Sequence, residues 1–102
     1  MRAVLPLFAL CAALATGPAV AQDNGQAVSR VVLTDASRAP TRATIIDGAN
    51  WRCEGQTCTA SGGAAQPAPR ACRRVVARFG PVTEFSWKGV ALTAEEIAAC
   101  NA

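Results

Sequence analysis

Alternating and β-branched residues along the chain predict a set of short strands. The segments with this pattern are 28–33, 42–46, 49–53, 57–60 and 82–87, with 90–92 as a short return. Asp47-Gly48 and Lys88-Gly89 are signals for two-residue turns between neighbouring strands. Strict alternation in 82–87 would place Val82, Glu84 and Ser86 on one face and Thr83, Phe85 and Trp87 on the other. The pattern predicts a small antiparallel sheet.

Two other segments have the periodicity of helices. The first would include Pro69 in its opening turn and end at Gly80-Pro81, and the second would begin after Thr93, which forms a capping box with Glu96. Ile97 and Cys100 share a face of the second helix. One side of the first helix is apolar, with Cys72, Val75, Val76 and Phe79, and the opposite side is cationic, with Arg70, Arg73, Arg74 and Arg78. The predicted fold is α+β, a small antiparallel sheet with two short helices.

The remaining segments are predicted as loops. Residues 34–40 form a polar connection, and the glycine-rich stretch 61–67 has few side chains to bury, so it is predicted as a flexible loop.

The first 21 residues have the pattern of a secretory signal peptide. Arg2 precedes an apolar run over 3–15, Gly17-Pro18 breaks it, and Ala19-Val20-Ala21 is a small-x-small cleavage pattern. The alternative is an uncleaved membrane anchor, but the run is shorter than the roughly 20 residues that a spanning helix needs. We therefore expect cleavage after Ala21, no membrane span afterwards, and a periplasmic or secreted product. Residues 22–27 would form a polar tail and 28–102 a single domain.

Packing alone would give so small a domain only marginal stability, and its cysteines can supply covalent reinforcement. Of five cysteines in 102 residues, cleavage removes Cys11 and leaves an even number for an oxidising compartment. Three pairings of these four are possible. Cys53 and Cys58 bracket the four-residue connection Glu54–Thr57 of a predicted hairpin, which leaves Cys72 and Cys100 on the inward faces of the two helices. We predict a domain stabilised by two disulfides, Cys53–Cys58 and Cys72–Cys100.

Other cysteine chemistry fits the spacing less well. A zinc site needs two converging ligand pairs, whereas Cys72 and Cys100 have no close partner and the chain contains no histidine. A thioredoxin-like centre uses Cys-x-x-Cys at the start of a helix, whereas Cys53 and Cys58 have four residues between them and lie in strand and turn. We expect no metal and no cofactor, with thiol-disulfide chemistry as an alternative.

Few other residues are candidates for catalysis or for binding a partner. Histidine is absent, the adjacent pair Glu95-Glu96 is explained by helix capping, and Asp47 by its turn, so we expect no enzyme. Without Arg2, nine basic residues face seven acidic ones, a net charge of about +2 that does not imply nucleic acid. Trp51 and Trp87 are interpreted as core residues, with exposed partner anchors as the alternative.

The arginine side of the first helix is the one surface with a functional hypothesis. Its side chains are suited to bidentate bonds with phosphate or carboxylate groups. The alternative is an ordinary solvated helix face. The candidate anion-binding residues are Arg70, Arg73, Arg74 and Arg78.

A longer motif is carried by Asp47-Gly48-x-x-Trp51-x-Cys53-x-Gly55-x-x-Cys58-x-Ala60, Ala71-Cys72-Arg73, Gly80-Pro81-Val82, Phe85 and Ala99-Cys100-Asn101. It resembles a group of small exported alphaproteobacterial proteins of unknown function. The resemblance implies a bacterial periplasmic or secreted location and assigns no functional residue.

Together these features favour an exported, non-catalytic accessory or binding protein of the bacterial envelope. Its partner would be an anionic envelope component or a periplasmic protein. Two alternatives stay open: an inhibitor of an envelope or extracellular hydrolase that presents the Glu54–Thr57 loop, and a thiol-disulfide redox protein.

Overall fold

The computed structural model describes residues 28–102; the predicted signal peptide (1–21), Cys11 and the predicted tail (22–27) lie outside the described residues. The described part contains six strands, two α-helices and one short 3-10 helix. In chain order they are β1 (Ser29–Leu33), η1 (Ala36–Arg38), β2 (Thr44–Ile46), β3 (Ala49–Glu54), β4 (Thr57–Gly62), α1 (Ala68–Phe79), β5 (Val82–Trp87), β6 (Val90–Ala91) and α2 (Ala94–Asn101).

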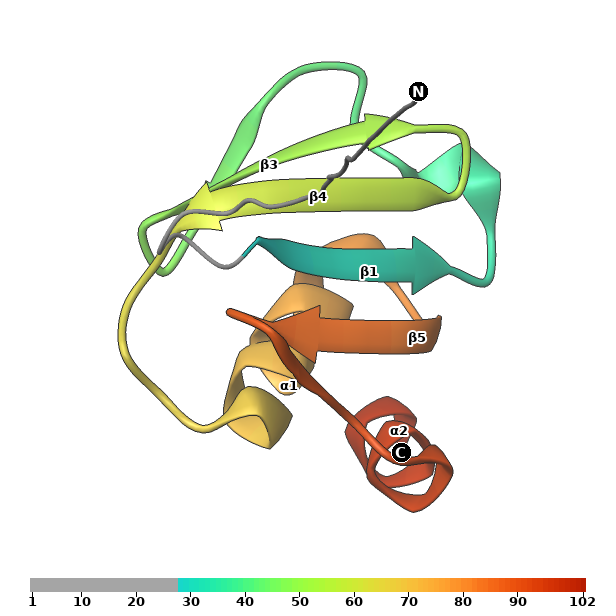
Figure 1. Ribbon diagram of the computed structural model, residues 1–102. Helices are drawn as coiled ribbons and strands as arrows, with labels where there is room; N and C mark the ends of the chain where they lie inside the picture. The colour runs from blue at the N-terminus through green and yellow to red at the C-terminus, as the bar shows by residue number, and fades with distance from the viewer. Residues whose placement is uncertain (1–27) are drawn as a thin grey trace, which may run out of the picture.

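The six strands form one antiparallel sheet in the order β2-β3-β4-β1-β5-β6. β1 lies in its middle, between β4 and β5, so the connection from β4 through α1 brings the chain to the other side of β1. Helix α1 covers one face of the sheet and α2 lies beside β5, as Figure 1 shows. The prediction of an α+β fold with an antiparallel sheet and two short helices is confirmed.

The core lies between the sheet and α1. Trp51 is completely buried, its ring edge-on to Phe79 of α1 and next to Phe85 of β5, with centroid distances of 6.4 and 6.3 Å. Trp87 is also buried and stacks on Phe85. Both tryptophans therefore fill the core, and the alternative that they are exposed partner anchors is wrong. Aromatic rings supply much of the apolar area in a domain with few large side chains.

Strand boundaries near the turns differ from the predicted ones. The β3–β4 hairpin has a two-residue turn, Gly55-Gln56, and not a four-residue connection, because Glu54 pairs with Thr57. At the other end Ala49 pairs with Gly62, so β4 continues two residues into the predicted loop. β2 begins at residue 44 and not 42, since its pairing with β3 ends there.

The predicted alternation of β5 is wrong at its start. Val82 is buried together with Phe85 and Trp87, whereas Thr83 and Glu84 are both exposed. The cause is a bulge, because the register with β1 shifts between Val32 and Leu33 and leaves one residue of β5 unpaired. The extra residue brings Val82 onto the core face.

Both helices begin and end as their sequence signals indicate. Pro69 lies in the first turn of α1, which ends before Gly80 at a positive φ of 85°. The capping box of α2 is complete, with Thr93 and Glu96 each accepting a hydrogen bond from the other's backbone N–H.

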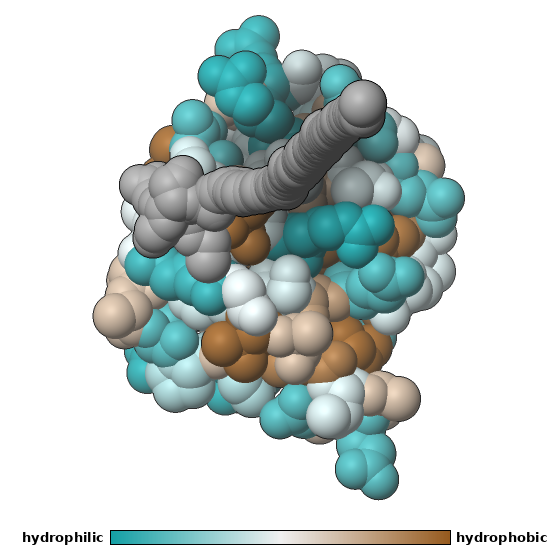
Figure 2. Space-filling model, in the orientation of Figure 1, coloured by the Kyte–Doolittle hydropathy of each residue, from teal (hydrophilic) through white to brown (hydrophobic). Residues whose placement is uncertain are grey.

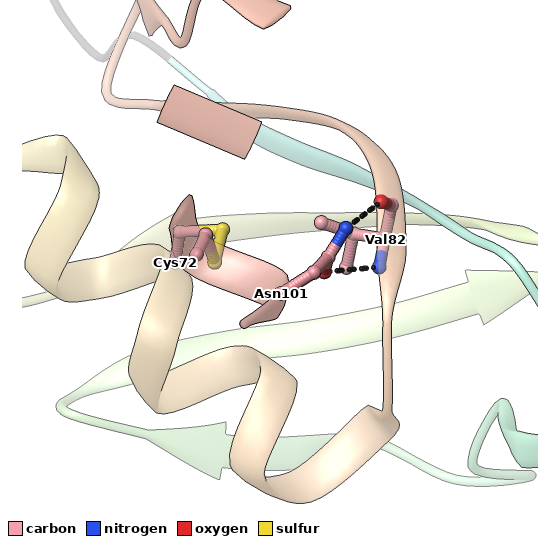
Figure 3. The surroundings of a disulfide bond; sticks show 4 residues. Cys72, Val82 and Asn101 are labelled. Atoms are coloured by element: carbon pink, nitrogen blue, oxygen red, sulfur yellow. Dashed lines mark hydrogen bonds between the residues drawn. A yellow bond between two sulfur atoms is a disulfide. The ribbon is translucent and has the colours of Figure 1, made fainter. Parts of the chain in front are cut away.

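The C-terminal end of α2 is held by two different contacts, both visible in Figure 3. Cys100 forms a disulfide with Cys72 of α1. The Asn101 amide donates to the Val82 carbonyl oxygen at 2.7 Å and accepts from the Val82 N–H at 2.9 Å. The side chain of Asn101 therefore pairs with the first residue of β5 as a neighbouring strand would.

A tight contact between the loop after β4 and the core makes Gly63 sensitive to substitution. A Cβ atom at this position would lie 2.6 Å from the Trp87 ring, and φ is +107°. We expect Gly63→Ala to lower the free energy of unfolding by about 1–3 kcal/mol, measured by denaturant titration. Gly55→Ala at the open hairpin tip is the control for positive φ without crowding; an equal loss there would contradict the packing explanation.

Candidate functional site

The four cysteines of the described chain form two disulfides, Cys53–Cys58 and Cys72–Cys100, which is the predicted pairing. The first joins directly opposed residues of the β3–β4 hairpin. The second links α1 to α2, 28 residues apart in sequence. Because the first closes a local hairpin and the second ties two distant helices, the second constrains the fold more.

Burial of the sulfur-bearing residues bears on the thiol-disulfide alternative. Cys58, Cys72 and Cys100 are buried, and only Cys53 is half-buried, in a hollow of about 230 Å³ beside Arg42 and Arg52. An attacking thiolate would meet Cys53, and Cys58 would leave as a thiolate inside the apolar core. Burying an unpaired charge is costly, so this arrangement favours a structural role.

The hairpin tip proposed as an inhibitor loop is short. Only Gly55 and Gln56 lie outside the strands, and the Gln56 side chain donates to the carbonyl oxygens of Leu33 and Thr34. The backbone N–H of Leu33 also donates to the Gln56 carbonyl at 2.7 Å. The tip is thus fastened to the end of β1. It has the rigidity of an inhibitor loop but few side chains to present.

The arginines of α1 lie where the helical pattern predicts, on the side of α1 away from the core. The residues that pack inward are Ala71, Cys72, Val75 and Phe79. All four arginines are exposed, at positions 70, 73, 74 and 78. We call this surface the arginine face. Since the core and the Cys72–Cys100 disulfide fix α1, the backbone that carries the arginine face is held in place.

One member of the arginine face already has a carboxylate partner. Arg74 donates through Nε to Oδ2 of Asp47 at 3.1 Å and through its terminal Nη2 to Oδ1 at 3.0 Å. Gln66 adds a third bond to Oδ2 at 3.2 Å. The sequence does not reveal this contact, because the Asp47-Gly48 turn already explains the aspartate. No local signal links residues 47 and 74.

The contact sets the charge state of Asp47. The hydrogen bond from Arg74, followed by that from Gln66, holds the pKa of Asp47 below its usual value, and the same contact raises the pKa of Arg74. Asp47 is therefore ionised at neutral pH and neutralises Arg74. One of the four candidate anion-binding arginines, Arg74, is thus already paired with a carboxylate of the same chain.

The ion pairs among residues 28–102 are Arg74–Asp47 and Arg30–Glu84. Three cations of the arginine face therefore have no carboxylate partner among these residues: Arg70, Arg73 and Arg78. Arg70 also borders a hollow of about 390 Å³ between α1, residues 64–67 and the β2–β3 turn. This hollow and the adjacent helix surface are the candidate anion-binding site.

The opposite face of the sheet has a different character. On the part of this face that is visible in Figure 2 many residues are hydrophilic, and apolar residues gather between β5 and α2. A groove of about 380 Å³ lies there, and Leu92 and Ile97 are among its apolar residues. The exposed pair Arg30–Glu84, at 2.8 Å, borders it.

Two other kinds of site are not found in residues 28–102. The described part has no group of three or more histidine, cysteine, aspartate or glutamate residues arranged to hold a metal ion. None of its helices is long and apolar enough to cross a membrane.

Fold and site together define a small disulfide-stabilised α+β domain with a cationic helix face. Residues 9–102 match the model of a family of unknown function, DUF8200, so the chain belongs to that family. No curated protein and no solved structure matches it.

Proposed function

We propose that the protein is an exported, non-catalytic binding protein of the bacterial envelope whose arginine face binds oxyanion groups of an anionic envelope component. The observation that carries this proposal is the exposure of Arg70, Arg73 and Arg78 on one helix face without carboxylate partners among the described residues. Guanidinium groups form paired hydrogen bonds with phosphate and carboxylate oxygens.

The geometry of α1 suits a ligand with several anionic groups. At a rise of about 1.5 Å per residue, positions 70 and 78 are separated by roughly 12 Å along the helix axis. The backbone beneath them is fixed by the core and by Cys72–Cys100. Because only the side chains lose freedom on binding, the entropy cost is lower than for a flexible cationic segment.

Export is supported by the signal-like first 21 residues and by the disulfides. Disulfides persist in oxidising compartments such as the bacterial periplasm. The resemblance to small exported alphaproteobacterial proteins supports the same location. An anionic envelope component fits the arginine face better than an unspecified periplasmic protein does, since the face is cationic and not apolar.

The two alternative functions have weaker support. The hairpin tip is rigid but its Gln56 side chain is bound to β1, which leaves little for a hydrolase to recognise. Thiol-disulfide exchange would create a buried Cys58 thiolate. Free thiols in the purified protein would favour the redox function.

Sedimentation with lipid vesicles tests the proposal. We expect the exported protein to bind vesicles of phosphatidylglycerol in phosphatidylcholine and not vesicles of phosphatidylcholine alone. Arg73→Glu with Arg78→Glu should weaken binding at least tenfold, because juxtamembrane cations each contribute about 1 kcal/mol. Binding should also fall as salt rises.

The matched control reverses two exposed arginines elsewhere. Arg42→Glu with Arg52→Glu makes the same change of net charge near the β3–β4 hairpin. An equal loss of vesicle binding in both double variants would show an effect of net charge and would contradict binding through the arginine face. Failure of the unmodified protein to bind anionic vesicles would also overturn the proposal.

A further inference from the structure

The hollow beside α1 contains a carboxylate held as a ligand would be. Asp47 accepts two bonds from the Arg74 guanidinium, one at each carboxylate oxygen, and one from the Gln66 amide. This two-pronged arrangement is the one that arginine uses for external carboxylates and phosphates. Asp47 comes from the β2–β3 turn, whereas Arg74 and Gln66 lie on and before α1.

The charges around the hollow are not balanced. Arg70 lies one helical turn before Arg74 and borders the same hollow. Its charge also contributes to the lowered pKa of Asp47. Two guanidinium groups thus face one carboxylate, and a net positive charge remains. An oxyanion with more than one charge would complement the hollow better than Asp47 does.

The backbone of Asp47 does not depend on its carboxylate. Asp47 and Gly48 have φ angles of 50° and 82° in a two-residue hairpin turn. The Ala64 N–H donates to the Asp47 carbonyl oxygen at 2.8 Å, which fastens the turn to the loop before α1. The carboxylate can therefore leave Arg74 by side-chain rotation alone, while the turn stays in place.

Solvent reaches the contact. The Arg74 side chain is 57% exposed and the Asp47 side chain 18%, so solvent screens the ion pair from the Arg74 side and weakens it. A multivalent oxyanion that bonds both Arg70 and Arg74 has two cationic partners where Asp47 has one.

We infer that Asp47 is a built-in competitor, occupying the oxyanion site of Gln66, Arg70 and Arg74 until an external phosphate or carboxylate group displaces it. The inference rests on the proposed function and specifies one part of it. When a ligand has displaced the Asp47 carboxylate, Arg74 binds the ligand. When no ligand is bound, Arg74 links α1 to the β2–β3 turn through Asp47.

Asp47→Asn tests the competition. Asparagine adopts positive φ readily, so the turn is preserved, and the neutral amide releases Arg74. We expect about threefold to fivefold tighter binding, the factor for a site whose arginine is available about a fifth to a third of the time, as a weak ion pair allows. The probes are vesicles that contain phosphatidic acid, whose phosphate monoester can carry more than one charge, and inorganic pyrophosphate. They distinguish a lipid phosphate from a free phosphate as the source of the group. A thermal melt of the variant verifies that it is folded.

Two further variants decide the interpretation. Asp47→Asn with Arg74→Gln should lose the gain, because the gain requires the released guanidinium. Glu84→Gln is the matched control, since it also removes one negative charge and releases an arginine, Arg30, on the other face. No gain with either probe, an equal gain in Glu84→Gln, or a gain that persists without Arg74 would each overturn the inference.

These outcomes are separate from the test of the proposed function. If Arg73→Glu with Arg78→Glu weakens binding and Asp47→Asn leaves it unchanged, the result supports anion binding by the arginine face and contradicts competition by Asp47. If the unmodified protein and Asp47→Asn both fail to bind either probe, both proposals fail.

Discussion

Replacing Cys72 and Cys100 together by alanine is expected to lower the free energy of unfolding by about 3.6 kcal/mol, the chain-entropy value for a loop of this length. Folded small domains are stable by only about 5–15 kcal/mol, so this is a large share of the total. The effect should be visible as a lower midpoint in denaturant titration. The physical reason is that the bond joins two cysteines 28 positions apart in sequence, one on each helix.

The hairpin disulfide provides the comparison. Cys53→Ala with Cys58→Ala should cost only about 2 kcal/mol, because the closed loop is much shorter. Alanine at both positions also leaves no unpaired thiol to form a wrong disulfide. A hairpin variant less stable than the helix variant would contradict the view that Cys72–Cys100 is the main constraint on the fold.

Truncating Trp51 to alanine is expected to cost about 3–5 kcal/mol, because a large ring leaves a cavity that the surroundings fill only in part. The residue is completely buried and contacts aromatic rings from both α1 and β5. Loss of the cooperative transition in a thermal or denaturant melt would be the extreme form of this result.

Two substitutions separate packing from other effects. Trp51→Phe should cost much less than Trp51→Ala, since most of the ring volume remains and Nε1 of Trp51 makes no hydrogen bond in the described structure. Ile45→Ala removes a large apolar side chain that is 60% exposed, and its cost should stay within about 0.5 kcal/mol. A comparable loss in Ile45→Ala would contradict the assignment of Trp51 to the core.

Local sequence signals predicted most of the elements. Two-residue turns at Asp47-Gly48 and Lys88-Gly89 place four strands, and the capping box at Thr93 fixes the start of α2. The inward side of α1 followed from helical periodicity. The cysteine pairing followed from these elements, because only Cys53 and Cys58 fit one hairpin.

Contacts between distant segments could not be predicted in the same way. The bulge in β5 arises from its pairing with β1, so periodicity within 82–87 misplaced Val82. The Asn101–Val82 and Asp47–Arg74 contacts join residues 19 and 27 positions apart, and the Asp47-Gly48 turn already explained Asp47. Helical spacing predicts the side of α1 on which its arginines lie, but it does not predict which partners reach them from a distant turn.

The Cys72–Cys100 disulfide, which holds α1 and its arginine face in place, and the hairpin disulfide Cys53–Cys58 can both be identified directly in the purified protein. Proteolysis without reduction, followed by mass spectrometry of the linked peptides, is the measurement. The expected result is Cys53 linked to Cys58, Cys72 linked to Cys100, and no alkylated thiol. Substantial free thiol in folded protein, or a link between the hairpin and either helix, would contradict this architecture and with it the fixed cationic surface of α1.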